Sequence, residues 1–154
     1  MELNLRSVQP EDMDLLYRWA NDPVTRENAF HTEQIPYERH RQWFESALAD
    51  ETVVMYICMN QEKPVGQIRF NISDEQALIS YSVDRDNRGC GVGTKLLMLA
   101  EIQLRDEFPR VRILKGEVKY GNIASMKAFE RNGYGRKEKE AYVEFKKVTG
   151  EKLF

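Results

Sequence analysis

The chain has 154 residues, a length that suits one domain spanning residues 1–154, and 42% of them are hydrophobic, enough to fill a core. Its 23 Lys and Arg residues against 25 Asp and Glu residues give a net charge of −2, which argues against a nucleic-acid binder that works by bulk positive charge. The longest apolar run, residues 53–59, is far shorter than the roughly 20 residues of a membrane-spanning helix, and the N-terminus is too polar for a signal peptide. From these features we expect no membrane partner. Cys58 and Cys90 lie far apart without metal-ligand spacing, so we also expect no metal site and a cytoplasmic location.

The first third of the chain reads as one strand and two helices. Residues 2–8 alternate as a strand does, and Pro10, followed by two acidic residues, begins a helix that ends at residues 21–23. A second helix begins near Pro36. Residues 24–35 between them are predicted to be a loop, and loops of about a dozen residues are often functional in compact domains.

The hydrophobic period then changes from 3.6 to 2. We predict three antiparallel strands at residues 52–59, 65–72 and 77–83, followed by a polar, glycine-rich loop at 84–93 and a helix at 94–108.

The last third continues with a strand at 111–118, a helix at 123–132 and one or two short strands, the clearer at 142–148. Gly133 is expected to cap the helix. The order β-α-α-β-β-β-α-β-α-β predicts an α+β fold (mixed α/β) with a mostly antiparallel central sheet and helices on its faces.

The most informative segment is Arg88-Gly89-Cys90-Gly91-Val92-Gly93-Thr94, between a strand and a helix. Its three glycines let the backbone turn tightly and approach a ligand without a Cβ in the way. The amide groups and the open N-terminus of the next helix predict a cradle for a pyrophosphate, with Arg88 at its rim. The spacing fits neither the dinucleotide GxGxxG pattern nor a P-loop. For three glycines alone, a plain flexible connection is the alternative.

The pattern is narrower than three glycines. Residues 88–93 fit (Arg/Gln)-x-x-Gly-x-(Gly/Ala) and resemble the acetyl-CoA pyrophosphate loop of the GNAT superfamily of N-acetyltransferases. Asn122-Ile123-Ala124-Ser125, then Ala128-Phe129 and Gly133-Tyr134, are similar to a downstream segment of that superfamily that contacts the CoA arm. Asn122 also suits a helix N-cap.

The resemblance implies a GNAT-type fold in which strands 77–83 and 111–118 splay apart, with the pantetheine arm inserted between them. It implies acetyl-CoA as cosubstrate and no metal. The residues that it implies for acetyl-CoA binding are Val83, Arg88, Gly89, Cys90, Gly91, Val92, Gly93, Thr94, Asn122, Ser125 and Phe129.

The implied reaction is direct attack of a primary amine on the acetyl thioester. It needs a base for the amine, a donor for the oxyanion, which the N–H near Val83 usually supplies in this superfamily, and an acid for the thiolate. Phe129 stands where many relatives carry the acidic tyrosine, and Leu78 stands where many carry a strand glutamate. The polar candidates left nearby are Glu117, Tyr81, Ser82 and Tyr120, with Glu117 and Tyr81 first. Glu117 also suits a solvated strand position, and Tyr81 a core aromatic.

The acceptor amine is suggested by residues 18–26, Phe30 and residues 40–44. This pattern resembles the acetyltransferases that act on UDP-linked 4-amino-4,6-dideoxy sugars in the pseudaminic-acid route and, less closely, those of ribosomal-protein N-termini. The first resemblance implies a small-molecule nucleotide sugar as partner and leaves a homodimer open. It implies that Arg26 pairs with a phosphate, Phe30 or Trp43 stacks on a ring, and His40 donates or accepts a hydrogen bond.

Other readings stay open. Trp43 and His40 at helical spacing also suit core positions. A peptide N-terminal acetyltransferase, an enzyme for a drug, polyamine or amino acid, and a non-enzymatic acyl-CoA-binding module are the alternatives.

Overall fold

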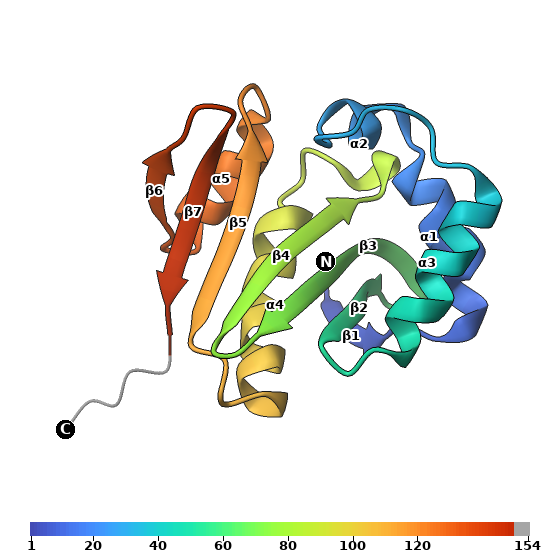
Figure 1. The fold of residues 1–154 in the computed structure, drawn as a ribbon, viewed down its shortest axis with the longest axis horizontal. Helices are drawn as coiled ribbons and strands as arrows, with labels where there is room; N and C mark the ends of the chain where they lie inside the picture. Colours follow the sequence, from blue (N-terminus) through green and yellow to red (C-terminus); the bar gives the residue numbers. More distant parts are fainter. Residues whose placement is uncertain (150–154) are drawn as a thin grey trace.

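The structure, a computed structural model, describes residues 1–149 and contains one seven-stranded sheet in the order β1-β2-β3-β4-β5-β7-β6 (Figure 1). The strands are β1 (Leu3–Ser7), β2 (Val53–Asn60), β3 (Lys63–Ser73), β4 (Gln76–Val83), β5 (Ile113–Lys119), β6 (Gly135–Glu138) and β7 (Tyr142–Val148). The helices are α1 (Met13–Ala20), α2 (Pro23–Glu27), α3 (Tyr37–Ala49), α4 (Val92–Glu107) and α5 (Ile123–Arg131), with short 3₁₀ turns η1 (Pro10–Asp12) and η2 (Arg85–Asn87).

All neighbouring strands are antiparallel except β4 and β5, which are parallel. The predicted mixed, mostly antiparallel sheet is therefore confirmed. β4 and β5 pair only from Gln76 opposite Ile113 to Ile79 opposite Gly116. Beyond these pairs the two strands diverge, as the upper half of Figure 1 shows.

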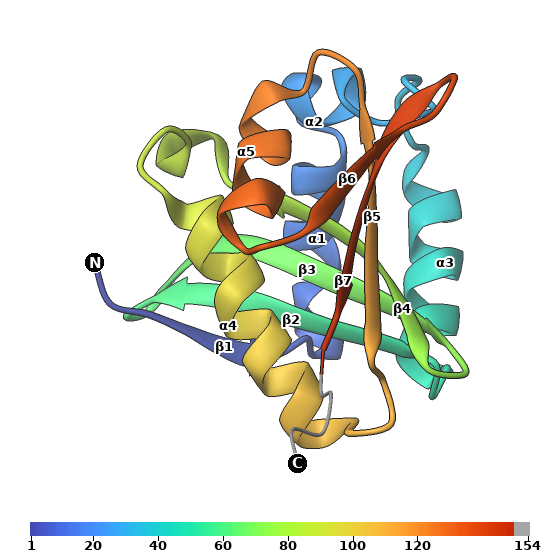
Figure 2. The same cartoon turned by 90° about the vertical axis from the view of Figure 1, so that its left-hand side faces the viewer.

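The sheet separates two cores because its strands are pleated. On β2, Tyr56 and Cys58 pack into the larger core with α4 and α5, whereas Met55 and Ile57 pack into the smaller core with α1 and α3. Figure 2 shows α4 and α5 on one side of the sheet and α3 on the other. β2 is thus apolar on both faces, which explains why its sequence is a continuous apolar run.

Several elements differ from the predicted bounds, and two of the differences have a clear local cause. The expected loop 24–35 contains most of α2, because Pro23 follows α1 and also begins the next helix. The Asp22 side chain caps α2 by accepting from the N–H groups of Val24 and Thr25 at 3.1 Å each. α4 begins at Val92, two residues before the predicted start at Thr94, because Gly91 supplies the N-cap with a left-handed backbone.

Within residues 1–149, none of the helices combines the length and apolar character that a membrane crossing requires. The same part of the chain holds no group of three or more His, Cys, Asp and Glu side chains placed to bind a metal ion.

Candidate active site

The diverging edge of β4 is the first component of the site. The N–H of Asp84 donates to the carbonyl of Val65 on β3 at 2.8 Å. Since residues of an antiparallel pair alternate between bonding the partner strand and facing away from it, the main-chain groups of Tyr81 and Val83 point away from β3, toward β5. Pairing with β5 has already ended at Ile79. These N–H and C=O groups are therefore left to bind an extended ligand between the strands.

The N-terminus of α4 is the second component. Gly89 and Gly91 have φ of +78° and +83°, and a Cβ added to either would meet no atom within 4 Å. No side chain caps this helix, and its first internal bond runs from Lys95 N–H to the Gly91 carbonyl. The amides of residues 92–94 thus lack an acceptor within the helix, beside open space and at the positive end of the helix dipole. This geometry fits the pyrophosphate of acetyl-CoA.

The other loop residues take different positions. The Val92 side chain is buried, so only its amide is available to a ligand. Cys90 is exposed, and its Sγ donates to the Asn87 carbonyl at 2.9 Å. The Thr94 carbonyl accepts from Asn132 Nδ2 at 3.1 Å, which ties the first turn of α4 to the end of α5.

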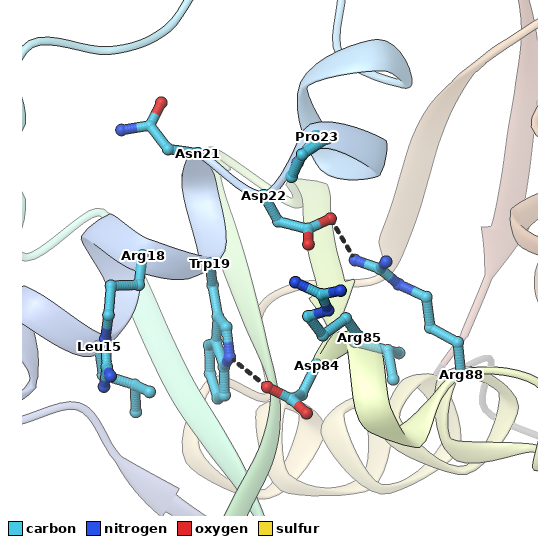
Figure 3. A pocket seen from close by; sticks show the side chains of 10 residues that line it. Leu15, Arg18, Trp19, Asn21, Asp22, Pro23, Asp84, Arg85 and Arg88 are labelled. Atoms are coloured by element: carbon cyan, nitrogen blue, oxygen red, sulfur yellow. Dashed lines mark hydrogen bonds and ion pairs between the residues drawn. The ribbon is translucent and has the colours of Figure 1, made fainter.

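Arg88 does not stand free at the rim of this cradle. Its Nη2 lies 2.7 Å from Asp22 Oδ2 and 3.3 Å from Thr25 Oγ1, so it joins the loop to α2 (Figure 3). Burial alone would raise the pKa of Asp22, but the hydrogen bonds from Arg88 and from the N–H of Thr25 outweigh it and lower that pKa. Arg88 thus forms an ion pair between segments 66 residues apart in the chain, and its predicted contact with acetyl-CoA stays a prediction.

A pocket of about 360 Å³ lies between α1 and the end of β4 (Figure 3). Val83 contributes to its wall, which places the pocket beside the open β4 edge. Trp19 and Asp84 also line it, and Trp19 Nε1 donates to Asp84 Oδ1 at 2.9 Å, which joins α1 to the end of β4. Three arginines, Arg18, Arg85 and Arg88, and two aspartates, Asp22 and Asp84, line it, so the lining carries a net charge of +1. We call it the α1–β4 pocket.

Tyr81 and Ser125 meet on the α4–α5 side of the sheet. The Tyr81 hydroxyl donates to Ser125 Oγ at 3.1 Å, and its ring meets that of Phe129 edge to face at 5.9 Å. Burial raises the pKa of Tyr81, so the phenol stays protonated at neutral pH. Gly93 passes over this ring, and a Cβ there would already lie 3.4 Å from it. That distance is ordinary van der Waals contact, so the first turn of α4 packs directly on the Tyr81 ring.

Glu117 and Ser82 lie on the opposite face of the sheet, which α4 and α5 do not cover. We call this the open face of β4 and β5; Leu78 and Ser80 are also exposed on it. Glu117 is exposed, and its carboxylate raises the pKa of the neighbouring Tyr142 hydroxyl. Ser82 Oγ accepts from Gln67 Nε2 at 3.0 Å. The candidate acid–base groups are thus divided between the two faces.

Asn122 and Phe129 have clear structural roles. Asn122 Oδ1 accepts from the N–H of Ser125 at 3.3 Å, which confirms the N-cap interpretation, while the predicted contact with CoA stays a prediction. Phe129 is buried and stacked on Phe145 at 5.3 Å. A Cβ on Gly116 would lie 2.3 Å from its ring, so glycine on β5 makes room for this ring beside the diverging strands.

Two of the residues expected to contact the acceptor are occupied within the protein. Arg26 donates through Nε to the Ala20 carbonyl at 2.7 Å and through Nη1 to the carbonyls of His31 and Glu33. His40 is buried between α3 and α1, with Nε2 3.1 Å from the Met13 carbonyl, and burial lowers its pKa. Arg26 therefore shapes the loop after α2, and its predicted contact with a phosphate stays a prediction. His40 joins two helices, which fits the core position that its spacing also allowed.

Phe30 and Trp43 remain exposed. Phe30 meets Tyr142 of β7 at 5.9 Å, and Trp43 stands under the guanidinium of Arg69. Lys119 was not predicted from any sequence pattern. Its Nζ donates to the carbonyls of Glu27 and Ala29 and so joins the tip of β5 to α2. A second pocket of about 440 Å³ lies beside this contact.

The comparisons with known proteins agree with this geometry. The family model described as "Acetyltransferase (GNAT) domain" matches residues 2–135. The aminoglycoside acetyltransferase AAC(6')-Ib, solved with ribostamycin and coenzyme A, has a TM-score of 0.83 at 21% identity over 96% of this chain and 94% of that chain.

Two further solved structures are similar. The spermidine N-acetyltransferase from Vibrio cholerae, with CoA and spermine, has a TM-score of 0.83 at 12% identity over 95% of each chain. The ribosomal-protein acetyltransferase RimL, with coenzyme A, has a TM-score of 0.82 at 15% identity over 96% of this chain and 94% of that chain. No curated protein sequence matches. At these identities the likeness shows the fold, and it confirms the predicted fold class.

Proposed function

Since this chain belongs to the acetyltransferase (GNAT) domain family, we propose that it transfers the acetyl group of acetyl-CoA directly to a primary amine of a small molecule. The observation that carries the proposal is the combination of an unbonded β4 edge with an uncapped α4 N-terminus. The first suits an extended amide-containing arm, and the second suits a pyrophosphate. Both lie at the ends of the same strand-to-helix connection.

The main chain supplies two functions in this arrangement. The amides around Gly91 bind the pyrophosphate, and the free N–H groups of Tyr81 and Val83 are donors for the pantetheine arm and for the oxygen of the acetyl group. Donors fixed in a strand need no rearrangement as negative charge develops on that oxygen.

Side chains on the two faces handle the protons. Glu117, on the open face, is placed to accept a proton from the amine, directly or through water. Tyr81, on the α4–α5 side, is placed to donate a proton to the departing thiolate, and its raised pKa keeps that proton available. The C–N bond forms as the C–S bond breaks, and the products are an amide and CoA thiol.

For the acceptor we propose the 4-amino group of a UDP-linked amino-dideoxy sugar, the substrate class implied by residues 18–26, Phe30 and residues 40–44. The α1–β4 pocket supports this choice, because its lining carries a net charge of +1. Arg18 and Arg85 form no ion pair within residues 1–149, so they favour an anionic ligand over a polycation such as a polyamine. A peptide N-terminus and a neutral small amine are the competing acceptors.

The test is a mass-spectrometric screen with acetyl-CoA against UDP-amino sugars, short peptides and polyamines, in which acetylation is read as the added mass of one acetyl group. Thermal unfolding with UDP is a parallel test, since a ligand selective for the native state raises the melting temperature. We expect acetylation of a UDP-amino sugar and stabilisation by UDP. Stabilisation by acetyl-CoA without transfer to any amine would reduce the protein to an acyl-CoA-binding module.

A further inference from the structure

Arg69 occupies an unusual position on β3. It lies opposite Ser80 of β4 and Met55 of β2 in the sheet register. Its neighbours Ile68 and Phe70 face α4 in the larger core, so the Arg69 side chain projects from the other face, where Ser80 is exposed. The cation therefore lies on the same side of the sheet as the open face, one strand away from β4 and next to α3.

The guanidinium has little compensation within the protein. Its Nε donates to Asn71 Oδ1 at 3.0 Å, and its Cζ lies 5.1 Å from the centre of the Trp43 ring. Among residues 1–149 no carboxylate lies within ion-pair distance of it, and burial lowers its pKa. A partly desolvated cation without a counter-ion is unfavourable, and an anion would relieve this cost.

The position is also next to the reacting groups. Ser80 immediately follows Ile79, the last β4 residue paired with β5, so Arg69 stands level with the point at which the strands begin to diverge. Glu117, the proposed base, follows Gly116 at the same level of β5. Arg69 and Glu117 thus flank β4 on the same face, with backbones at least about 10 Å apart, since two strand spacings are the minimum where β4 and β5 diverge.

We propose that Arg69, stacked on Trp43, binds an anionic group of the acceptor, a phosphate or a carboxylate, while the amine of the same molecule is directed to Glu117. The inference rests on the proposed acetyl transfer but not on the identity of the sugar. The planar guanidinium keeps its Nη donors for a two-point bond to such an oxyanion, since within residues 1–149 only Nε has a hydrogen-bond acceptor. Acceptors that carry several positive charges are disfavoured there.

Two variants separate binding from a merely structural role. Arg69→Met removes the charge and keeps an apolar stem against Trp43. Asn71→Asp places a carboxylate where Arg69 already bonds, so it supplies an internal counter-ion while the arginine stays in place. If Arg69 only ties β3 to α3, Asn71→Asp should leave acceptor kinetics unchanged. Arg39→Met, which removes an exposed cation from α3, is the control for net charge.

Initial rates are measured with glucosamine, glucosamine 1-phosphate and muramic acid, which share an amino-sugar ring and differ in carrying no anion, a phosphate or a carboxylate. We expect the wild type and Arg39→Met to prefer one anionic acceptor. We expect Arg69→Met and Asn71→Asp to raise the KM for that acceptor by on the order of ten- to a hundredfold, with the KM for acetyl-CoA unchanged. The preferred anion identifies the group that is bound.

The inference is overturned if the ratio of kcat/KM between anionic and neutral acceptors is the same in wild type and both variants, or if Arg69→Met weakens all substrates equally. If none of the three amines is acetylated, titration with UDP and with inorganic phosphate, followed by tryptophan fluorescence, decides the question. A response in wild type that both variants lose supports the site, and no response in wild type refutes it. A wild type that does not bind acetyl-CoA would instead refute the proposed function, because that binding is assigned to the β4 edge and the α4 N-terminus and not to Arg69.

Discussion

Replacing Gly91 by alanine should separate backbone strain from ligand binding at the α4 N-terminus. With φ of +83°, a non-glycine residue here costs about 1–2 kcal/mol, because a left-handed backbone brings its Cβ too close to the carbonyl oxygen. For a chain of this size that corresponds to a fall in melting temperature of about 2–8 °C. The added Cβ meets no protein atom within 4 Å, so the protein should still fold. It would, however, occupy the space assigned to the pyrophosphate.

Gly133→Ala is the matched control. Its φ is +82°, and its Cβ would meet nothing closer than the Cε of Lys147 at 4.0 Å, so the strain is the same at a site outside the cradle. Calorimetric titration with CoA should give at least a tenfold weaker Kd for Gly91→Ala than for Gly133→Ala, since one lost charge-assisted hydrogen bond costs about 1.5–3 kcal/mol. Equal Kd values for the two variants would refute the assignment of the loop.

Three shorter predictions address other parts of the site. Cys90 is exposed whereas Cys58 is fully buried with its pKa raised to about 11, so a thiol reagent should modify Cys90 alone; saturating acetyl-CoA should slow that reaction, and an unchanged rate would count against the cradle. Tyr81→Phe should lower kcat on the order of a hundredfold while the Kd for CoA changes little; an unchanged kcat would remove Tyr81 as the acid. The pKa of His40 is lowered in the folded protein, so the unfolded chain takes up a proton first as the pH falls. The free energy of unfolding should therefore keep its full His40 contribution above about pH 6.5 and decrease below that pH. Thermal unfolding of wild type and His40→Gln at about pH 7.5 and about pH 5.5 should show a smaller pH dependence in the variant, and equal dependences would contradict this account.

Local patterns were enough to predict the order of the main elements. Hydrophobic period separated strands from helices, and the glycine spacing at residues 88–93 indicated the strand-to-helix turn that forms the cradle. The position of α2 required a more careful reading of one proline: Pro23 ends α1, but Asp22 before it is also a favourable N-cap, so the same residues begin a new helix. That signal was present in the sequence and was missed.

Long-range pairings could not be predicted in this way. Arg88 binds Asp22, and Arg69 stacks on Trp43, because the fold brings together segments that are distant in the chain. For His40 the helical spacing left both a core position and an acceptor contact open, and the packing of α1 against α3 decides for burial. Strand pleating alone places Tyr81 and Glu117 on opposite faces of the sheet. The gap between their strands, however, depends on where the β4–β5 pairing ends.

Lys119 gives the diverging strands a further property. By donating to the carbonyls of Glu27 and Ala29, it joins β5 to α2 across the wide end of the gap. The donor, bound at the α4 N-terminus, would bring its thioester carbon into the gap from the α4–α5 side of the sheet. The amine would reach the same carbon from the open face, so the two substrates would enter from opposite sides. Such an arrangement favours a sequential kinetic scheme with a ternary complex and without a covalent acetyl-enzyme intermediate.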